Sequence, residues 1–217
     1  MERIDTAMIL RRTGEMLRLT PVTALIAWLG MALPMTMLST APGGGNFAFV
    51  GSIISTFAQF IVTSRAARRA GVMRAEGVPG RAASYVLLGI VSGLAIAIGF
   101  VLLVLPGLYL LARWSIAVPH VIVRGATMRE AMRRSWQQTR DIVPPTCAAL
   151  VLVGSGLIVS LILDGIAATA FGPAPLMPSL VSNLAAFASM LLTWFLALAI
   201  YTLVTREEPQ ELEEVFA

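Results

Sequence analysis

Apolar residues in this chain run in long, almost unbroken stretches, and short segments rich in arginine separate them. A helix that crosses the hydrocarbon core of a bilayer, which is about 30 Å thick, needs about 20 mostly apolar residues. Six stretches approach that length, two of them marginally: they run from about residue 20 to 39, 46 to 63, 82 to 105, 107 to 123, 144 to 167 and 179 to 205. The pattern predicts an all-α membrane protein, a single polytopic domain with six transmembrane helices.

The third and fourth stretches form one continuous apolar run that contains Pro106 and Gly107. Proline removes a backbone donor and glycine favours a turn, so we expect the run to break there into two spans. A kinked helix or a re-entrant element at this place is the alternative that the sequence leaves open.

Two segments, residues 1–19 and 127–140, are amphipathic with helical periodicity. Their apolar arcs comprise Ile9, Leu10, Thr13, Met16 and Leu17 in the first segment and Met128, Ala131, Met132, Ser135, Trp136 and Thr139 in the second. Thr127 and Glu130 form a capping-box start for the second segment. We predict two interfacial helices, each with its apolar arc in lipid and its arginines toward phosphates.

The two amphipathic segments also resemble each other. Arg11-Arg12-Thr13 corresponds to Arg133-Arg134-Ser135, and each segment is followed by a proline and an apolar stretch. An internal duplication of a surface helix plus a hairpin, around a central pair, is one interpretation, and chance similarity in a biased composition is the other.

Composition and charge agree with a membrane location. The chain is 57% hydrophobic and 13% charged, which leaves too few polar residues to cover a soluble domain. All 16 basic residues are arginines, and all except Arg113 lie in the leader, in the second or fourth connection, or after the last stretch. By the positive-inside rule we expect both termini in the cytoplasm.

The net positive charge of the chain comes from these arginines, whose positions follow the membrane topology. We therefore expect no nucleic-acid partner. Usage of arginine without lysine, together with abundant alanine, suggests a GC-rich bacterial genome. With helical spans and cytoplasmic termini, we expect the protein in the bacterial cytoplasmic (inner) membrane. Five glutamates make residues 206–217 an acidic tail.

The segment LPGLYLLARWSIAVPHVIVRGATMREAMRRSWQQTRD, residues 105–141, resembles the signature of the bacterial membrane-domain family named after glycerophosphoryl diester phosphodiesterase. In that family a Pro-Gly turn opens a span that bears an arginine, a proline closes it, and an amphipathic helix follows. The matching positions are Pro106, Gly107, Tyr109, Arg113, Pro119, Ala131, Ser135 and Thr139. Arg124 departs from the pattern, because an acidic residue is expected there.

The resemblance implies a membrane region without the soluble phosphodiesterase domain that gives the family its name. A metal-dependent phosphodiesterase needs clustered Glu, Asp and His ligands. Here His120 is the only histidine, and the acidic residues are scattered. We therefore expect no catalytic centre, no metal site and no cofactor.

Arg113 is the one basic residue inside an apolar stretch, where a charge faces protein, pairs or reaches water. Asp164 is the acidic residue at matching depth, so we expect an Arg113–Asp164 ion pair near the outer side of the bundle. Snorkelling of Arg113 and a ligand site are the alternatives. His120, two turns after Arg113, is interpreted as a hydrogen-bonded interface residue, with a proton relay as the alternative.

Val153-Gly154-Ser155-Gly156 lacks the first glycine of an intramembrane serine-protease motif. Gly154 and Gly156, together with Gly89 and Gly93, are interpreted instead as small residues that let helices approach one another.

These features favour a non-catalytic membrane protein that acts through lipid or protein contacts, in membrane homeostasis or in support of a separate enzyme. Anionic lipid head groups are the expected partners of the surface arginines, which are Arg11, Arg12, Arg18, Arg129, Arg133, Arg134 and Arg140. A protein partner or a second copy of the chain is a further expectation. The alternative is a small transporter or channel in which Arg113, Asp164 and His120 line the path.

Overall fold

The computed structural model describes residues 4–40, 48–73, 81–172 and 176–216, and within these ranges every regular element is a helix. In chain order the elements are α1 (Thr6–Leu19), α2 (Pro21–Thr40), α3 (Ala48–Arg69), α4 (Arg81–Leu102), α5 (Val104–Arg113), α6 (Ala117–Arg124), α7 (Met128–Gln138), the 3₁₀ turn η2 (Arg140–Ile142), α8 (Val143–Phe171) and α9 (Leu176–Phe216). The predicted all-α class is confirmed.

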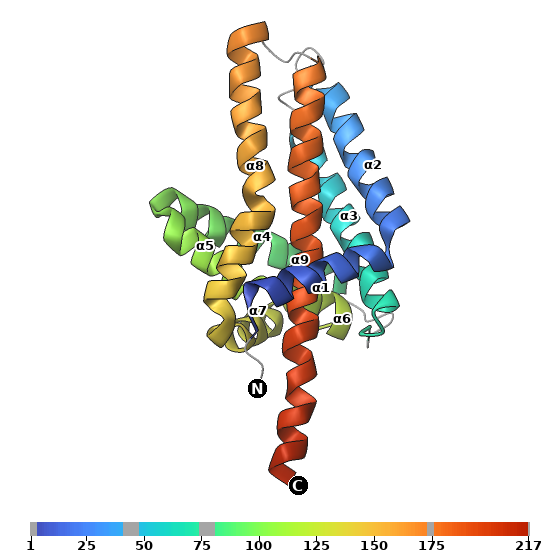
Figure 1. Ribbon diagram of the computed structural model, residues 1–217, viewed down its shortest axis with the longest axis vertical. Helices are drawn as coiled ribbons and strands as arrows, with labels where there is room; N and C mark the ends of the chain where they lie inside the picture. Colours follow the sequence, from blue (N-terminus) through green and yellow to red (C-terminus); the bar gives the residue numbers. More distant parts are fainter. Residues whose placement is uncertain (1–3, 41–47, 74–80, 173–175, 217) are drawn as a thin grey trace.

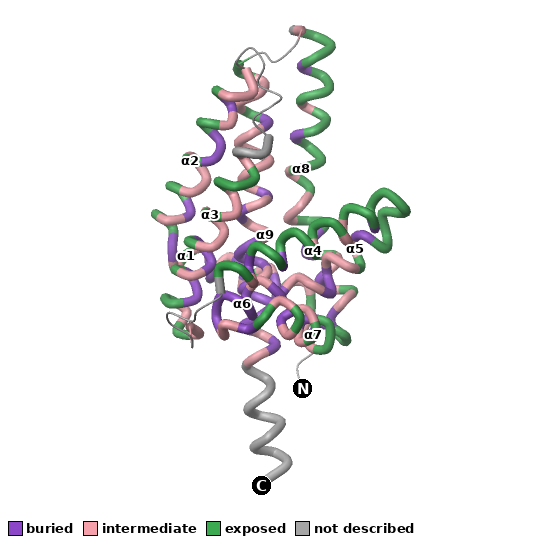
Figure 2. The backbone as a smooth tube through the Cα atoms, turned by 180° about the vertical axis from the view of Figure 1, so that it is seen from behind, coloured by how far each residue is buried: buried purple, intermediate pink, exposed green. Residues whose placement is uncertain are grey.

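Four long helices, α2, α3, α8 and α9, run alongside one another, and α9 lies at their centre (Figure 1). The helix α1 crosses α9 near the level from which the other three rise, and α6 and α7 lie at the same end. Buried residues concentrate at this end, whereas the upper part of α8 is largely exposed (Figure 2). The exposed residues of that part of α8 are mostly large and apolar, as expected for a surface in contact with lipid.

Five described segments are long and apolar enough to cross a membrane: Pro21–Thr40, Ala82–Leu102, Val104–Arg124, Arg140–Ala170 and Leu176–Thr205. The predicted membrane class rests on them. The expected second span, residues 46–63, coincides mainly with α3, which is not among the five, and residues 46 and 47 lie outside the described part. The expectation of six spans is therefore met only in part.

The break between the third and fourth expected spans lies at Leu103, which has extended backbone, and not at Pro106-Gly107. Pro106 occupies the first turn of α5, where a helix has no internal partner for a backbone N–H, so the missing donor costs nothing. Gly107 acts through its size: a Cβ atom there would lie 2.7 Å from the backbone nitrogen of Phe100 on α4. The Pro-Gly pair therefore starts a helix and allows a tight α4–α5 hairpin.

The fourth expected span, residues 107–123, is divided between α5 and α6 by a turn at residues 114–116. Ten residues of α5 rise only about 15 Å, half the thickness of the hydrocarbon core. The α4–α5 hairpin projects sideways beyond α8, and its tip ends well below the upper ends of α2, α8 and α9 (Figures 1 and 2).

Both amphipathic helices form close to their predicted bounds. Thr127 accepts a hydrogen bond from the backbone nitrogen of Glu130 (3.4 Å), which confirms the predicted cap of α7. Asp5 caps α1 in the same way through Met8 (2.7 Å). The expected burial of their apolar arcs in lipid needs correction, however, because the central residues of both arcs are covered by protein.

The helix α9 extends through Phe216, so the segment expected as an acidic tail continues the last helix. The side chains of residues 206–217 lie outside the described part of the structure.

The glycines expected to permit close helix packing divide into two groups. A Cβ atom at Gly156 of α8 would clash with the hydroxyl of Ser189 on α9, which confirms the interpretation there. Nothing lies within 4 Å of a Cβ built at Gly89, Gly93 or Gly154, so the interpretation is wrong at these three positions.

Candidate functional site at the junction of α5 and α7

The most unusual polar feature of the described residues lies where α5 ends against α7. The backbone carbonyl of Arg113 accepts a hydrogen bond from the hydroxyl of Ser135 (2.8 Å), and the single donor of Thr139 is shared between this carbonyl (3.1 Å) and the carbonyl of Ser135 (2.7 Å). The last carbonyls of a helix have no partner within it, and residues four apart share one face of a helix, so the two hydroxyls of α7 cap the end of α5. This contact accounts for hydroxyl residues at both positions.

The side chain of Arg113 is only 4% exposed, so it does not snorkel to water. Its guanidinium carbon lies 4.2 Å from the ring centre of Trp136 and 5.8 Å from that of Tyr109. Trp136 in turn contacts Tyr109 edge-to-face at 5.9 Å, and Trp114 at 6.1 Å. Aromatic rings thus surround a buried cation, an arrangement that stabilises the charge by about 2 kcal/mol when water is excluded.

The expected ion pair between Arg113 and Asp164 does not form within the described structure. Asp164 is exposed on α8. The sulfur of Cys147, which lies near the start of α8, contacts the carbonyl of Leu108 on α5 at 3.9 Å. From there Asp164 is roughly 25 Å further along the helix axis. The prediction placed the Pro106-Gly107 turn at the outer end of the bundle, whereas the α4–α5 hairpin ends well below the upper end of α8 (Figure 1).

His120 belongs to a different contact, between α6, α7 and α9. It is fully buried, its Nε2 lies 2.8 Å from Oε1 of Gln138, and its ring packs edge-to-face on Tyr201. The expected hydrogen bond of His120 forms, and its partner is a protein side chain inside the fold. Nε of Arg124 donates to the hydroxyl of Tyr201 (3.1 Å), so the arginine that departs from the family pattern joins α6 to α9.

Arg113, Asp164 and His120 therefore have three separate sets of neighbours. Three residues that the sequence did not single out, Trp114, Gln138 and Tyr201, take part in these contacts. Trp114 and Gln138 lie inside the family-like segment and could have been suspected, whereas nothing in the sequence relates Tyr201 to a segment so far away.

The positions of the family-like signature meet in this region. Pro106 starts α5, Gly107 allows the hairpin to close, and Pro119 lies in the first turn of α6. Tyr109 flanks the guanidinium of Arg113, and Ala131 is fully buried on the face of α7 that carries Ser135 and Thr139. Gly125, in a left-handed conformation (φ 69°), ends α6 and turns the chain into α7.

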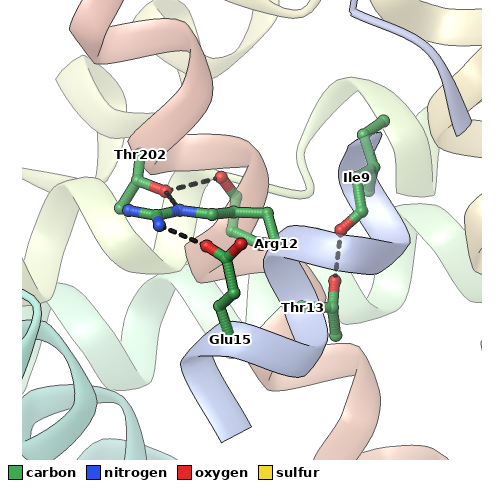
Figure 3. Close-up of polar contacts among 6 residues, drawn as sticks. Ile9, Arg12, Thr13, Glu15 and Thr202 are labelled. Atoms are coloured by element: carbon green, nitrogen blue, oxygen red, sulfur yellow. Dashed lines mark hydrogen bonds and ion pairs between the residues drawn. The ribbon is translucent and has the colours of Figure 1, made fainter. Parts of the chain in front are cut away.

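The expected lipid-contacting arginines differ in how they are held. Nε of Arg12 donates to the hydroxyl of Thr202 on α9 (3.3 Å), and its Nη1 pairs with Glu15 (2.6 Å; Figure 3). Arg134 pairs with Glu130 along α7 (2.7 Å). The remaining members are exposed: they are Arg11, Arg18, Arg129, Arg133 and Arg140.

A shallow polar hollow of about 500 Å³ lies on α7, lined by Arg133, Arg134, Gln137 and Gln138. Among the described residues no group of three or more His, Cys, Asp or Glu side chains could hold a metal ion.

Fold and site thus define an all-helical protein with apolar helices of membrane-spanning length and a basic, aromatic region at one end. A comparison of the chain with protein-family models, curated proteins and solved structures returned no match. The resemblance to the phosphodiesterase-associated membrane-domain family stays a prediction.

Proposed function

We propose that the chain is a non-catalytic, multi-pass protein of a bacterial cytoplasmic membrane that acts through contacts with anionic lipids of the inner leaflet. The observation that carries the proposal is the gathering of exposed arginines on α1 and α7, at one end of the four long helices. Anionic head groups attract such arginines by about 1 kcal/mol for each charge near the surface. Support of a separately encoded enzyme is compatible with this role.

The proposed topology has four spans, α2, α3, α8 and α9, and a re-entrant α4–α5 hairpin. Two arguments support it. The tip of the hairpin, around Leu103, is strongly exposed and apolar, and α5 is too short to cross the membrane. The four remaining long helices give an even number of crossings, which keeps the arginine-rich connections and both termini on the cytoplasmic side.

Accessibility of single cysteines distinguishes this topology from six spans. With Cys147 replaced by alanine, cysteines introduced at Gly44, Leu103 and Gln137 are treated with a membrane-impermeant maleimide on intact cells and after permeabilisation. We expect labelling from outside at Gly44, labelling at Gln137 only after permeabilisation, and none from outside at Leu103. Labelling at Leu103 from outside would establish six spans.

Lipid contact itself is measured by thermal unfolding in detergent. A ligand that binds the folded state raises its stability. We expect phosphatidylglycerol to raise the melting temperature more than phosphatidylcholine, and we expect salt to reduce the difference. In the triple variant Arg129→Gln, Arg133→Gln, Arg140→Gln, most of the difference in melting temperature between the two lipids should be lost. Equal shifts with both lipids in the unaltered protein would overturn the proposal.

The transporter alternative depended on Arg113, Asp164 and His120 lining one path. Since the structure gives these residues separate surroundings, no observation favours that alternative.

A further inference from the structure

Arg113 is a buried cation for which the described part of the chain provides no anion. Its Nε and Nη1 atoms are sealed from solvent and have no hydrogen-bond partner. The ion pairs Arg12–Glu15 and Arg134–Glu130 do not involve it. Because a buried guanidinium with unmet donors is costly, such a group is a place where an anion binds favourably.

The stacking on Trp136 leaves the hydrogen-bonding edge of the guanidinium free. A cation–π contact uses the flat face of the group, whereas the N–H donors point outward in its plane. Two edges of the guanidinium, Nε with Nη2 and Nη1 with Nη2, each carry two parallel N–H donors that match two oxygens of a phosphate or carboxylate, and this paired geometry is the strongest that arginine forms. The aromatic contact therefore holds the group and leaves its donors for an oxyanion.

The region is anchored on one side and covered on the other by two rings that face outward, so an anion reaches the guanidinium by displacing one of these rings. Ser135 and Thr139 bind the backbone carbonyl of Arg113, which fixes where α5 ends. Trp136 and Tyr109, which cover the guanidinium, are 37% and 43% exposed. Tyrosine and tryptophan lie preferentially at head-group depth in membranes, where phosphates are the abundant anions.

We propose that Arg113 binds one phosphate-type oxyanion through its Nε and Nη donors, with Trp136 and Tyr109 as the walls of the site. The depth of the site rests on the proposed function, but the site differs from the exposed arginines of α7. Those arginines attract head groups in a diffuse, salt-sensitive way, whereas a desolvated bidentate site should hold one phosphate and resist salt.

Native mass spectrometry of the full chain in detergent tests the site. Phosphatidylglycerol is the lipid probe, diacylglycerol is the probe without phosphate, and inorganic phosphate is the soluble probe. We expect one phosphatidylglycerol to remain bound at high salt, and we expect Arg113→Gln to weaken this retention by at least about tenfold. The exposed Arg133→Gln is the matched control and should retain the lipid. Equal retention by Arg113→Gln and the unaltered protein would overturn the proposal.

Two further variants cover the case in which Arg113→Gln does not fold. Arg113→Lys keeps the charge but lacks the planar pair of donors, and Trp136→Leu removes the stacking wall, so both should bind more weakly. If both bind as tightly as the unaltered protein, the bidentate, stacked site does not exist.

The soluble probe separates the two sources of phosphate. A change in tryptophan fluorescence with millimolar inorganic phosphate, absent in Arg113→Gln, supports a site for free phosphate. Lipid retention that inorganic phosphate does not displace supports a head-group site, and either result supports the oxyanion receptor.

Failure of the site and failure of the proposed function give different results. Salt-sensitive preference for phosphatidylglycerol that is unchanged in Arg113→Gln removes only the site. Loss of any preference for phosphatidylglycerol over diacylglycerol in the unaltered protein removes both.

Discussion

The helices α1 and α7 share an amphipathic, arginine-rich sequence pattern but dock in different ways. In α1 the buried face carries the large residues Ile9 and Met16, and it packs on α8 and α9. In α7 the fully buried positions are the small residues Ala131, Ser135 and Thr139, which face the end of α5 and α6. Large residues give α1 a hydrophobic contact, whereas small residues let α7 approach another backbone and cap it.

The hydroxyl groups on the two faces show the same difference. The hydroxyl of Thr13 on α1 donates to the carbonyl of Ile9 in its own helix (2.8 Å; Figure 3), so this bond does not join α1 to another helix. Ser135 of α7, which corresponds to Thr13 in sequence, donates to a carbonyl of another helix. Corresponding positions in the two amphipathic helices thus form different hydrogen bonds, because the helices pack against different neighbours.

The largest difference in stability between variants of α1 and α7 should come from substitutions in their apolar faces. Met16→Ala on α1 removes a fully buried side chain and should lower the free energy of unfolding by about 2–5 kcal/mol, through lost burial and a cavity. Met132→Ala on α7, where the side chain is only partly buried, should cost clearly less. Thermal unfolding in detergent, followed by circular dichroism, measures both. Equal losses would show that the two helices dock alike.

The next effect concerns the cap of α5. Ser135→Ala combined with Thr139→Val leaves the buried carbonyl of Arg113 without these donors and should cost about 1–3 kcal/mol. Thr13→Val is the matched control on α1, because it removes a buried hydroxyl that bonds only within its helix. A control that destabilises as much as the double variant would argue against a capping role.

A smaller effect should follow from closing the space in the hairpin on which α7 packs. Gly107→Ala brings a Cβ atom against the backbone of Phe100 and should destabilise by about 1–2 kcal/mol, since overpacking outweighs the better helix propensity of alanine. Gly93→Ala in α4 meets nothing within 4 Å and should instead stabilise by up to about 1 kcal/mol. Hydrogen exchange should show faster exchange in α7, and not in α1, for Gly107→Ala alone.

The smallest effect should come from the ion pairs along each helix. Arg134→Gln removes an exposed pair with Glu130 and should change the unfolding free energy by less than about 0.5 kcal/mol. Arg12→Gln should cost slightly more, because Arg12 also binds Thr202 on α9. The ranking is checked in the same unfolding assay. A larger loss of unfolding free energy for Arg134→Gln than for Arg12→Gln would show that the arginine of α7, not that of α1, makes the tighter contact.

One observation supports the interpretation as an internal duplication, and another argues against it. Each surface helix is followed by two long helices, α2–α3 and α8–α9, with α4, α5 and α6 between the two units (Figure 1). The docking surfaces of α1 and α7 are nevertheless unrelated, so the duplication stays an interpretation.

The sequence by itself determined the helical class, the approximate bounds of most helices, the cap at Thr127 and the arcs of α1 and α7. These features depend on local hydrogen bonding and on the period of the helix, and both are set by residues close together in the chain. The position of Asp164 relative to Arg113, the break at Leu103 and the partner of each amphipathic arc were decided only by the tertiary structure. An apolar arc shows that a surface must be covered, but lipid and protein are equally apolar, so the pattern cannot distinguish between them. That choice depends on the shapes of segments far apart in the chain, as where Arg12 meets Thr202 or Arg124 meets Tyr201.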